Sequence, residues 1–192
     1  MHDAIDQIDQ LWRQIEARLS NLASQTGLHL VTGASEQAFD RLEAALDVVL
    51  PEDFRASYRR HDGGFSMRLG TSMEILPLAD IAETWQGLED LLRDDEWART
   101  TPYYFSEDVV RSGWHTGPIQ LVWWSRQWIP FAADRAGNHV CLDMAPGAGG
   151  VSGQIIEWDH ECGPSRVLFQ DFAHLLAAFA DQLEHSDDPQ AG

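Results

Sequence analysis

Short connections between three β-type segments constrain the fold of this chain more than any other feature of its sequence. Residues 119–124, 128–132 and 139–143 are mostly apolar, and only 125–127 and 134–138 lie between the turn-flanked segments. Both connections carry residues typical of turns, so each segment reverses the direction of the one before it. The sequence therefore predicts an antiparallel meander in the middle of the chain.

Helices are predicted before this meander. Apolar residues recur every three or four positions over 4–24, which favours a long amphipathic helix. Ser35 is a suitable N-cap for a second helix. Pro51 opens a third helix, whose first turn carries Glu52 and Asp53 to complement the helix dipole. The first 60 residues are therefore expected to be mainly helical.

The rest of the chain mixes strands and helices. Residues 65–78 read as a hairpin with Gly70 at its turn, and Asp80 is the expected cap of a fourth helix. A further strand at 154–158 and a C-terminal helix at about 169–184 follow. Helices at both ends with strands between them indicate an α+β fold with a mostly antiparallel sheet.

Two regions fit neither pattern. Residues 94–118 are irregular but rich in aromatic residues, so we expect an insert that packs on the body of the protein. Residues 185–192 are polar and are expected to form a flexible tail.

Composition excludes several classes of partner. The 192 residues carry a formal net charge of −18 and include no lysine. An acidic surface repels nucleic acid and anionic membranes, which are bound by clustered cations. The lack of lysine also excludes a P-loop lysine and a Schiff-base lysine. We therefore expect neither nucleic acid nor a membrane as a partner.

Cellular location follows from similar arguments. Two cysteines, Cys141 and Cys162, imply no disulfide framework. The N-terminal residues show no positive region followed by an apolar stretch, and no apolar run is long enough to span a membrane. A soluble, cytoplasmic protein is expected, and its oligomeric state is not indicated.

No group of residues forms a recognisable catalytic or metal site. The glycine-rich loop 147–153 leads into a strand instead of a helix N-terminus, so it is not predicted to bind phosphate. A calcium loop starting at Asp134 would need a glutamate where Ala145 stands. Loop 159–162 holds ligand-type side chains without the paired spacing of a metal site. We predict a non-enzymatic protein with no cofactor and no metal, and keep a hydrolase or metal enzyme at 159–162 as a third hypothesis.

A protein-binding surface is the alternative that the composition favours, because an acidic surface with exposed aromatic residues fits a binding protein better than an enzyme. Strand alternation would place Trp123 and Trp124 on opposite faces, leaving one of them exposed. An equally open alternative is that three of the candidate residues are structural. In that case Asp143 and Glu157 form hydrogen bonds at strand ends, and Trp158 lies in the core. The residues expected to flank a concave patch on the uncovered side of the sheet are Asp134, Asp143, Glu157, Trp158, Asp159 and Glu161, with one of Trp123 and Trp124.

Two motifs resemble a known family. The run from Leu50-Pro51-Glu52-Asp53-Phe54 through Tyr58 to His61-Asp62-Gly63-Gly64 resembles a signature of the Smi/Knr family in the SUKH superfamily. The run from Trp128-Ile129-Pro130 through Asp134, Gly137-Asn138 and Leu142-Asp143 resembles the hairpin of the same family. The sequence departs from the family at Asp62, where asparagine is usual. The motif residues expected to be structural are Pro51, Asp62, Gly63, Gly64, Gly137 and Asn138. The three glycines are expected where the backbone needs a positive φ or a close approach.

The resemblance covers about 35–184 and implies an α+β domain with helices packed on one side of the sheet. It leaves 1–34 as an N-terminal helical extension. For bacterial members it implies an immunity protein that neutralises a polymorphic toxin by direct binding, and for fungal members a regulator of cell-wall synthesis. The net charge favours a basic toxin, for example a nuclease. We therefore place toxin neutralisation first and a regulatory or scaffolding adaptor second.

Overall fold

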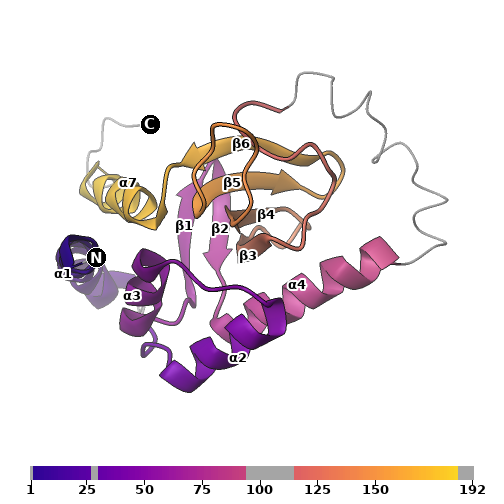
Figure 1. Cartoon of the computed structure of the whole chain (residues 1–192). Helices are drawn as coiled ribbons and strands as arrows, with labels where there is room; N and C mark the ends of the chain where they lie inside the picture. The colour runs from indigo at the N-terminus through magenta and orange to yellow at the C-terminus, as the bar shows by residue number, and fades with distance from the viewer. Residues whose placement is uncertain (1, 27–29, 94–114, 186–192) are drawn as a thin grey trace.

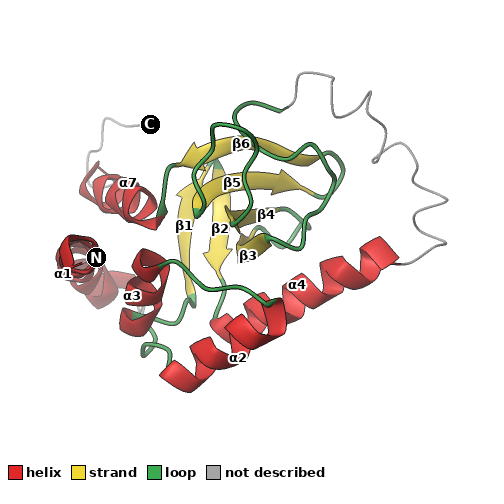
Figure 2. Cartoon of the chain, viewed as in Figure 1, coloured by secondary structure: helices red, strands yellow, loops and turns green. Residues whose placement is uncertain are grey.

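The computed structural model describes residues 2–26, 30–93 and 115–185 (Figure 1). These residues form an α+β fold with five helices and one six-stranded antiparallel sheet (Figure 2), as predicted. The order of the strands in the sheet is their order in the chain. The strands are β1 (Phe65–Leu69), β2 (Thr71–Ile75), β3 (Trp128–Ala133), β4 (His139–Asp143), β5 (Gln154–Asp159) and β6 (Gly163–Phe169).

The sheet bends sharply between β2 and β3. Only two residue pairs join these strands, Glu74 with Ala133 and Ile75 with Ala132, whereas five pairs join β1 to β2. A register shift in β3 between Pro130 and Ala132 adds to the distortion. In Figure 1 the β1–β2 hairpin consequently runs across the direction of β5 and β6. The bend makes one side of the sheet concave.

One predicted strand is absent and one strand was not predicted. Residues 119–124 form a loop, because the indoles of Trp123 and Trp124 both point into the protein instead of alternating. The indole N–H of Trp123 donates to the carbonyl of His160, and that of Trp124 donates to Glu89 Oε1. Strand β6 escaped prediction because Gly163 and Pro164 interrupt its pattern, which an edge strand tolerates.

The described helices are α1 (His2–Thr26), α2 (Glu36–Leu46), α3 (Glu52–Arg60), α4 (Leu78–Arg93) and α7 (Phe172–His185). Ser35 caps α2 by accepting a hydrogen bond from the Ala38 N–H, as predicted. The prediction that Asp80 caps α4 is wrong, because the Leu78 N–H at the start of that helix donates to Asp62 Oδ1 at 2.8 Å. The predicted insert at 94–118 lies outside the described residues up to 114, and so does nearly all of the tail at 185–192.

Acidic motif residues tie helix starts to distant parts of the chain. Pro51 is the N-cap residue of α3. In the first turn of the same helix, Asp53 Oδ2 accepts a hydrogen bond from the N–H of Phe172 at 2.9 Å. This bond fixes the start of α7, which lies three residues later than predicted because Phe169 completes β6. The first turns of α3 and α7 are therefore held side by side.

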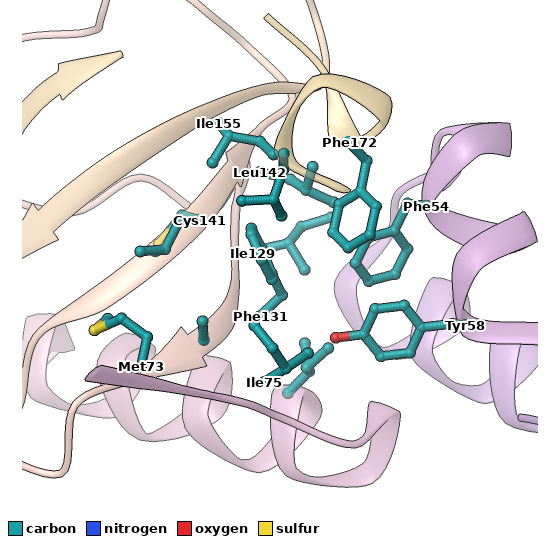
Figure 3. Packing of buried hydrophobic residues seen from close by; sticks show 14 of the residues in the cluster. Phe54, Tyr58, Met73, Ile75, Ile129, Phe131, Cys141, Leu142, Ile155 and Phe172 are labelled. Atoms are coloured by element: carbon teal, nitrogen blue, oxygen red, sulfur yellow. The ribbon is translucent and has the colours of Figure 1, made fainter. Parts of the chain in front are cut away.

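An aromatic cluster joins these two helices to the sheet. Phe54 stacks on Tyr58 with ring centroids 4.2 Å apart and meets the edge of Phe172 at 5.2 Å. Phe172 in turn contacts Phe131 of β3 at 5.3 Å. Figure 3 shows the rings of Phe54 and Phe172 beside Ile129, Leu142 and Ile155 of the strands. The helical layer formed by α3 and α7 therefore packs on one face of the sheet.

Helix α1 is part of this core. Ile8, Trp12 and Ile15 on one stripe of the helix are fully buried. The Trp12 indole N–H donates to Ser57 Oγ at 2.9 Å, and its ring meets the edge of Phe65. On the same side of α1, the Glu16 carboxylate binds Arg60 through two hydrogen bonds of 2.6 Å. The N-terminal helix therefore packs on α3 as tightly as the helices of the domain pack on each other.

The ion pair of Glu16 makes the stability of the α1 contact depend on pH. Hydrogen bonds from Arg60, with His61 assisting and burial opposing, lower the pKa of Glu16 from 4.5 to about 2. Because the folded-state pKa is depressed, the stabilisation is present above pH 4.5 and is lost as the pH falls toward 2. After solvent screening we expect Glu16→Gln to lower the free energy of unfolding by about 1–2 kcal/mol at pH 7. Urea unfolding at pH 7 and pH 3 measures it, and the difference from wild type should shrink at pH 3.

Glu184→Gln is the matched control for this prediction. Glu184 also pairs with α1, through Arg18 at 3.8 Å, but both side chains are about half exposed. Such a pair contributes roughly 0–1 kcal/mol, so this variant should unfold almost like wild type at both pH values. Equal effects of the two substitutions would contradict the assignment.

Gly63 is required where the chain passes β2. The three motif glycines Gly63, Gly64 and Gly137 all have positive φ, as expected. At Gly63 (φ +64°) an added Cβ would also lie 2.5 Å from the backbone of Leu76. We expect Gly63→Ala to destabilise the protein by about 3 kcal/mol or more, through backbone strain plus steric overlap.

Gly149→Ala separates these two effects. Gly149 also has positive φ (+90°), but no atom lies within 4 Å of the position of its Cβ. This variant should cost only about 1 kcal/mol in a thermal or urea denaturation experiment. If both substitutions cost the same, the close approach of Gly63 to Leu76 has no energetic consequence.

Candidate functional site

A pocket of about 200 Å³ opens where the β1–β2 hairpin faces the strands β4 to β6. It exists because the sheet bends between β2 and β3, so residues far apart in the sequence line one hollow. It is lined by Leu69, Thr71, Met73, Asp134, Asn138, His139, Val140, Glu157, Trp158, Asp159, Cys162 and Ser165.

The lining has an apolar part and an acidic part. Leu69, Met73 and Val140 are buried and supply apolar surface from three different strands. Three half-buried carboxylates lie at the pocket: Glu157 and Asp159 belong to β5, and Asp134 follows β3. We call them the acidic rim. The pocket therefore combines an apolar lining with negatively charged side chains.

Asp134 organises the turn between β3 and β4. Its Oδ1 accepts hydrogen bonds from the N–H groups of Ala136 and Asn138, and its Oδ2 accepts one from the Asn138 side-chain amide at 2.7 Å. Partial burial opposes ionisation, but these hydrogen bonds outweigh it and hold the pKa of Asp134 below its ordinary value. Asp134 is therefore a charged, fixed part of the rim.

A second turn is locked to the first. Asn138 Oδ1 accepts from the Nδ1 of His160 at 2.9 Å and from the His160 N–H. In the same turn Asp159 Oδ1 accepts from the N–H groups of Glu161 and Cys162. The motif pair Gly137-Asn138 thus joins the β3–β4 turn to the β5–β6 turn, which holds the acidic rim together.

Glu157 completes the rim from the middle of β5. Its Oε2 accepts a hydrogen bond from Ser165 Oγ at 2.8 Å and pairs with the guanidinium of Arg166 at 2.9 Å. Both partners lie on β6. The Glu157 carboxylate is therefore held in place by β6, the strand that the sequence did not predict.

Asp143 lies inside the protein and not at the pocket. Its side chain is fully buried and accepts hydrogen bonds from Trp128 Nε1, Gln154 Nε2 and the Ala145 N–H. Burial raises the pKa of Asp143 above its ordinary value, although these hydrogen bonds oppose the shift. This arrangement matches the alternative reading of Asp143 as a strand-end hydrogen bonder.

The remaining predicted residues divide in a similar way. Trp123 and Trp124 are both buried, at 3% and 4% exposure, so neither offers the exposed aromatic surface expected of one of them. Trp158 is also buried, and only part of it lines the pocket. Glu161 is exposed but does not line the pocket. The structure thus places Asp134, Glu157, Trp158 and Asp159 at the pocket, whereas the other four do not line it.

Sequence reasoning did not find the apolar lining. Leu69, Thr71 and Met73 belong to a hairpin more than 60 residues before Asp134, and nothing in their local pattern indicates that they face it. The alternation of apolar residues in β1 and β2 predicts that these side chains are buried. It does not predict which residues they contact.

One thiol, that of Cys162, lines the pocket. Burial, with the nearby charges of Asp159 and Glu161, raises the pKa of the Cys162 thiol, which therefore stays protonated and is a weak nucleophile. In the described part of the chain no three His, Cys, Asp or Glu side chains gather in a way that could hold a metal ion. Within the same residues, no helix has the length and apolar character needed to cross a membrane.

Comparison with known proteins gives a consistent result. The model of the SMI1/KNR4 family (SUKH-1) matches residues 33–178. The cell wall biosynthesis/cell cycle regulator smi1 of Schizosaccharomyces pombe is 28% identical over 189 residues, which cover 93% of this chain and 36% of that protein. The cell wall assembly regulator SMI1 of Saccharomyces cerevisiae is 23% identical over 210 residues, covering 95% of this chain and 42% of that protein.

A shorter similarity extends beyond fungi. F-box only protein 3 of Mus musculus is 38% identical over 56 residues, which cover 29% of this chain and 12% of that protein. The chain spans less than half the length of each of these three relatives.

Asp143 and Glu161 provide a test of how the acidic residues divide. Asp143→Ala leaves three buried or half-buried donors without their acceptor, and we expect it to lower the free energy of unfolding by about 2–4 kcal/mol. Glu161→Ala removes an exposed side chain and should change stability by less than about 0.5 kcal/mol. Urea denaturation of both variants measures the difference. Similar stabilities would show that Asp143 is not the structural carboxylate described above.

Proposed function

The chain belongs to the SMI1/KNR4 family (SUKH-1), and on that basis we propose that it is a non-enzymatic protein-binding domain that acts as a regulator or scaffolding adaptor. The observation that carries the proposal is the family match over 33–178, together with fungal relatives that are named as regulators of the cell wall. The names of these relatives favour a regulator over toxin neutralisation. The sequence alone had placed toxin neutralisation first.

The proposal concerns the domain, since the fungal relatives are more than twice as long as this chain. A regulator of this kind acts by stoichiometric association with another protein. The protonated Cys162 thiol and the engaged carboxylates of the rim are consistent with association in place of turnover.

Toxin neutralisation is the second candidate, and one observation favours it. The net charge of −18 would steer the protein to a basic partner, such as a nuclease domain with a basic cleft. The carboxylates of the acidic rim and Glu161 lie together at one end of the sheet and would be the approach side. An adaptor for a neutral partner has no need of this charge.

Two assays in parallel distinguish these functions. In the first, the chain replaces the matching segment of the budding yeast relative, and growth is measured under cell-wall stress. In the second, the chain is co-expressed with a toxin domain encoded beside its gene, and survival is measured. Restored growth without protection supports the adaptor, protection without restored growth supports the immunity protein, and neither result in a folded, expressed chain argues against both.

Salt dependence tests whether charge guides association with the partner so identified. The variant Asp134→Asn/Asp159→Asn/Glu161→Gln should slow association about threefold or more at low ionic strength and change dissociation by less than about twofold. Stopped-flow or surface-based kinetics at two ionic strengths measures both rates, and a melting curve confirms folding.

The matched control removes the same number of charges elsewhere. Asp40, Glu83 and Asp90 are exposed on α2 and α4. Neutralising these three should slow association much less. If both triple variants associate at the same rate, the acidic rim does not form the approach side.

A further inference from the structure

The pocket of about 200 Å³ is smaller than most sites for metabolites or cofactors, which enclose about 300–1,000 Å³. It is large enough for one long side chain. Its position in the concave side of the sheet leaves it open to a protruding loop of another protein. Its size therefore points to part of a macromolecule as the occupant.

The lining has an apolar part and a negatively charged part, and a long cationic side chain would need both. Leu69, Met73 and Val140 give an apolar wall against which methylene groups can pack. The three carboxylates of the acidic rim stand beside this wall, and among the described residues an ion pair with Arg166 neutralises Glu157 alone. A side chain with an aliphatic stem and a positive head would satisfy both parts.

His139 adds a second and independent feature. It lines the pocket, is only 9% exposed, and its Nδ1 is buried with no hydrogen-bond partner. A buried polar atom without a partner is costly and uncommon in folded proteins. Burial lowers the pKa of His139, so the imidazole is uncharged at neutral pH and adds no positive charge that would repel a cation.

The rim already binds one guanidinium. The Nε of Arg166 lies 2.9 Å from Glu157 Oε2, and the Arg166 side chain is half exposed. This pair shows that Glu157 can bind a guanidinium, here through a single nitrogen of the planar group. It also means that Arg166 competes with any external cation for Glu157.

We propose that this pocket is a docking site for a single arginine side chain of a partner protein, with its stem against Leu69, Met73 and Val140 and its guanidinium at the acidic rim. The inference rests on the proposed protein-binding function and names the chemistry that the domain recognises. A partner loop that presents an exposed arginine would be anchored there, and a loop with glutamate at that position would be repelled.

The test uses a defined probe, so it does not depend on knowing the partner. The ¹⁵N-labelled protein is titrated with Nα-acetyl-arginine amide, and amide chemical shifts are followed by NMR. Saturable shifts should be confined to pocket-lining residues such as Val140 and Asp159. The neutral isostere Nα-acetyl-citrulline amide should bind about threefold or more weakly, because it lacks the charge.

Two pairs of variants locate the binding. Asp159→Asn keeps the acceptor for the Glu161 and Cys162 N–H groups but removes the charge, and it should weaken binding about threefold or more. Glu161→Gln removes the same charge outside the pocket and should not weaken it. Arg166→Gln frees Glu157 and should strengthen binding about twofold, whereas Arg18→Gln, which frees Glu184 outside the pocket, should not.

Several outcomes would overturn the proposal: shifts outside the pocket, equal binding of citrulline, or equal losses in Asp159→Asn and Glu161→Gln. If Asp159→Asn fails to fold, Glu157→Gln replaces it, because glutamine can still accept from Ser165. A negative titration rejects the arginine site and leaves the protein-binding proposal to the growth and survival assays, so the two failures are distinguishable.

Discussion

The packing of Phe54 and Phe172 against Phe131 is the contact on which the rest of this fold depends. Phe54 comes from α3, Phe172 from α7 and Phe131 from β3, so one aromatic group joins the helical layer to the middle of the sheet. Phe54 and Phe172 are more than 100 residues apart in the chain. Aromatic pairs in such edge-to-face arrangements contribute about 0.5–1.5 kcal/mol each beyond the area they bury. Together with the hydrogen bond from the Phe172 N–H to Asp53, these ring contacts hold α3 against α7.

Acidic residues in this protein have two distinct physical roles. Asp53, Asp62 and Asp143 accept hydrogen bonds from backbone or indole N–H groups and hold helix starts and strand ends. In Asp53 and Asp143, burial raises the pKa, which shows that their environment is not that of a surface charge. The carboxylates of the acidic rim remain half exposed and retain their charge for interactions outside the chain. The net charge of −18 therefore overstates the negative surface that a partner would meet.

The bend between β2 and β3 connects architecture with recognition. A flat six-stranded sheet would place the β1–β2 hairpin far from the β5–β6 turn, and no hollow would form between them. Two residue pairs between β2 and β3 suffice to continue the sheet while allowing it to turn. The two turns that carry the rim are then locked by Asn138 and His160. The recognition surface is therefore built on hydrogen-bonded turns of a rigid scaffold, which lowers the entropic cost of binding.

The sequence by itself determined the helices, because their apolar stripes and the Ser35 cap are local signals that need no distant partner. It also determined the β3–β4 hairpin and the positive-φ glycines, since short turns allow few backbone conformations, but the strand it predicted at 119–124 is a loop. Tertiary structure alone decided the burial of Trp123 and Trp124. Their indoles bond to His160 and Glu89, and they do not point alternately to the two faces of a strand. It likewise decided which carboxylates are exposed: Asp143 and Asp159 look alike in sequence, but only Asp143 lies where Trp128 and Gln154 enclose it. Burial depends on neighbours that the fold brings together, and no local pattern encodes them.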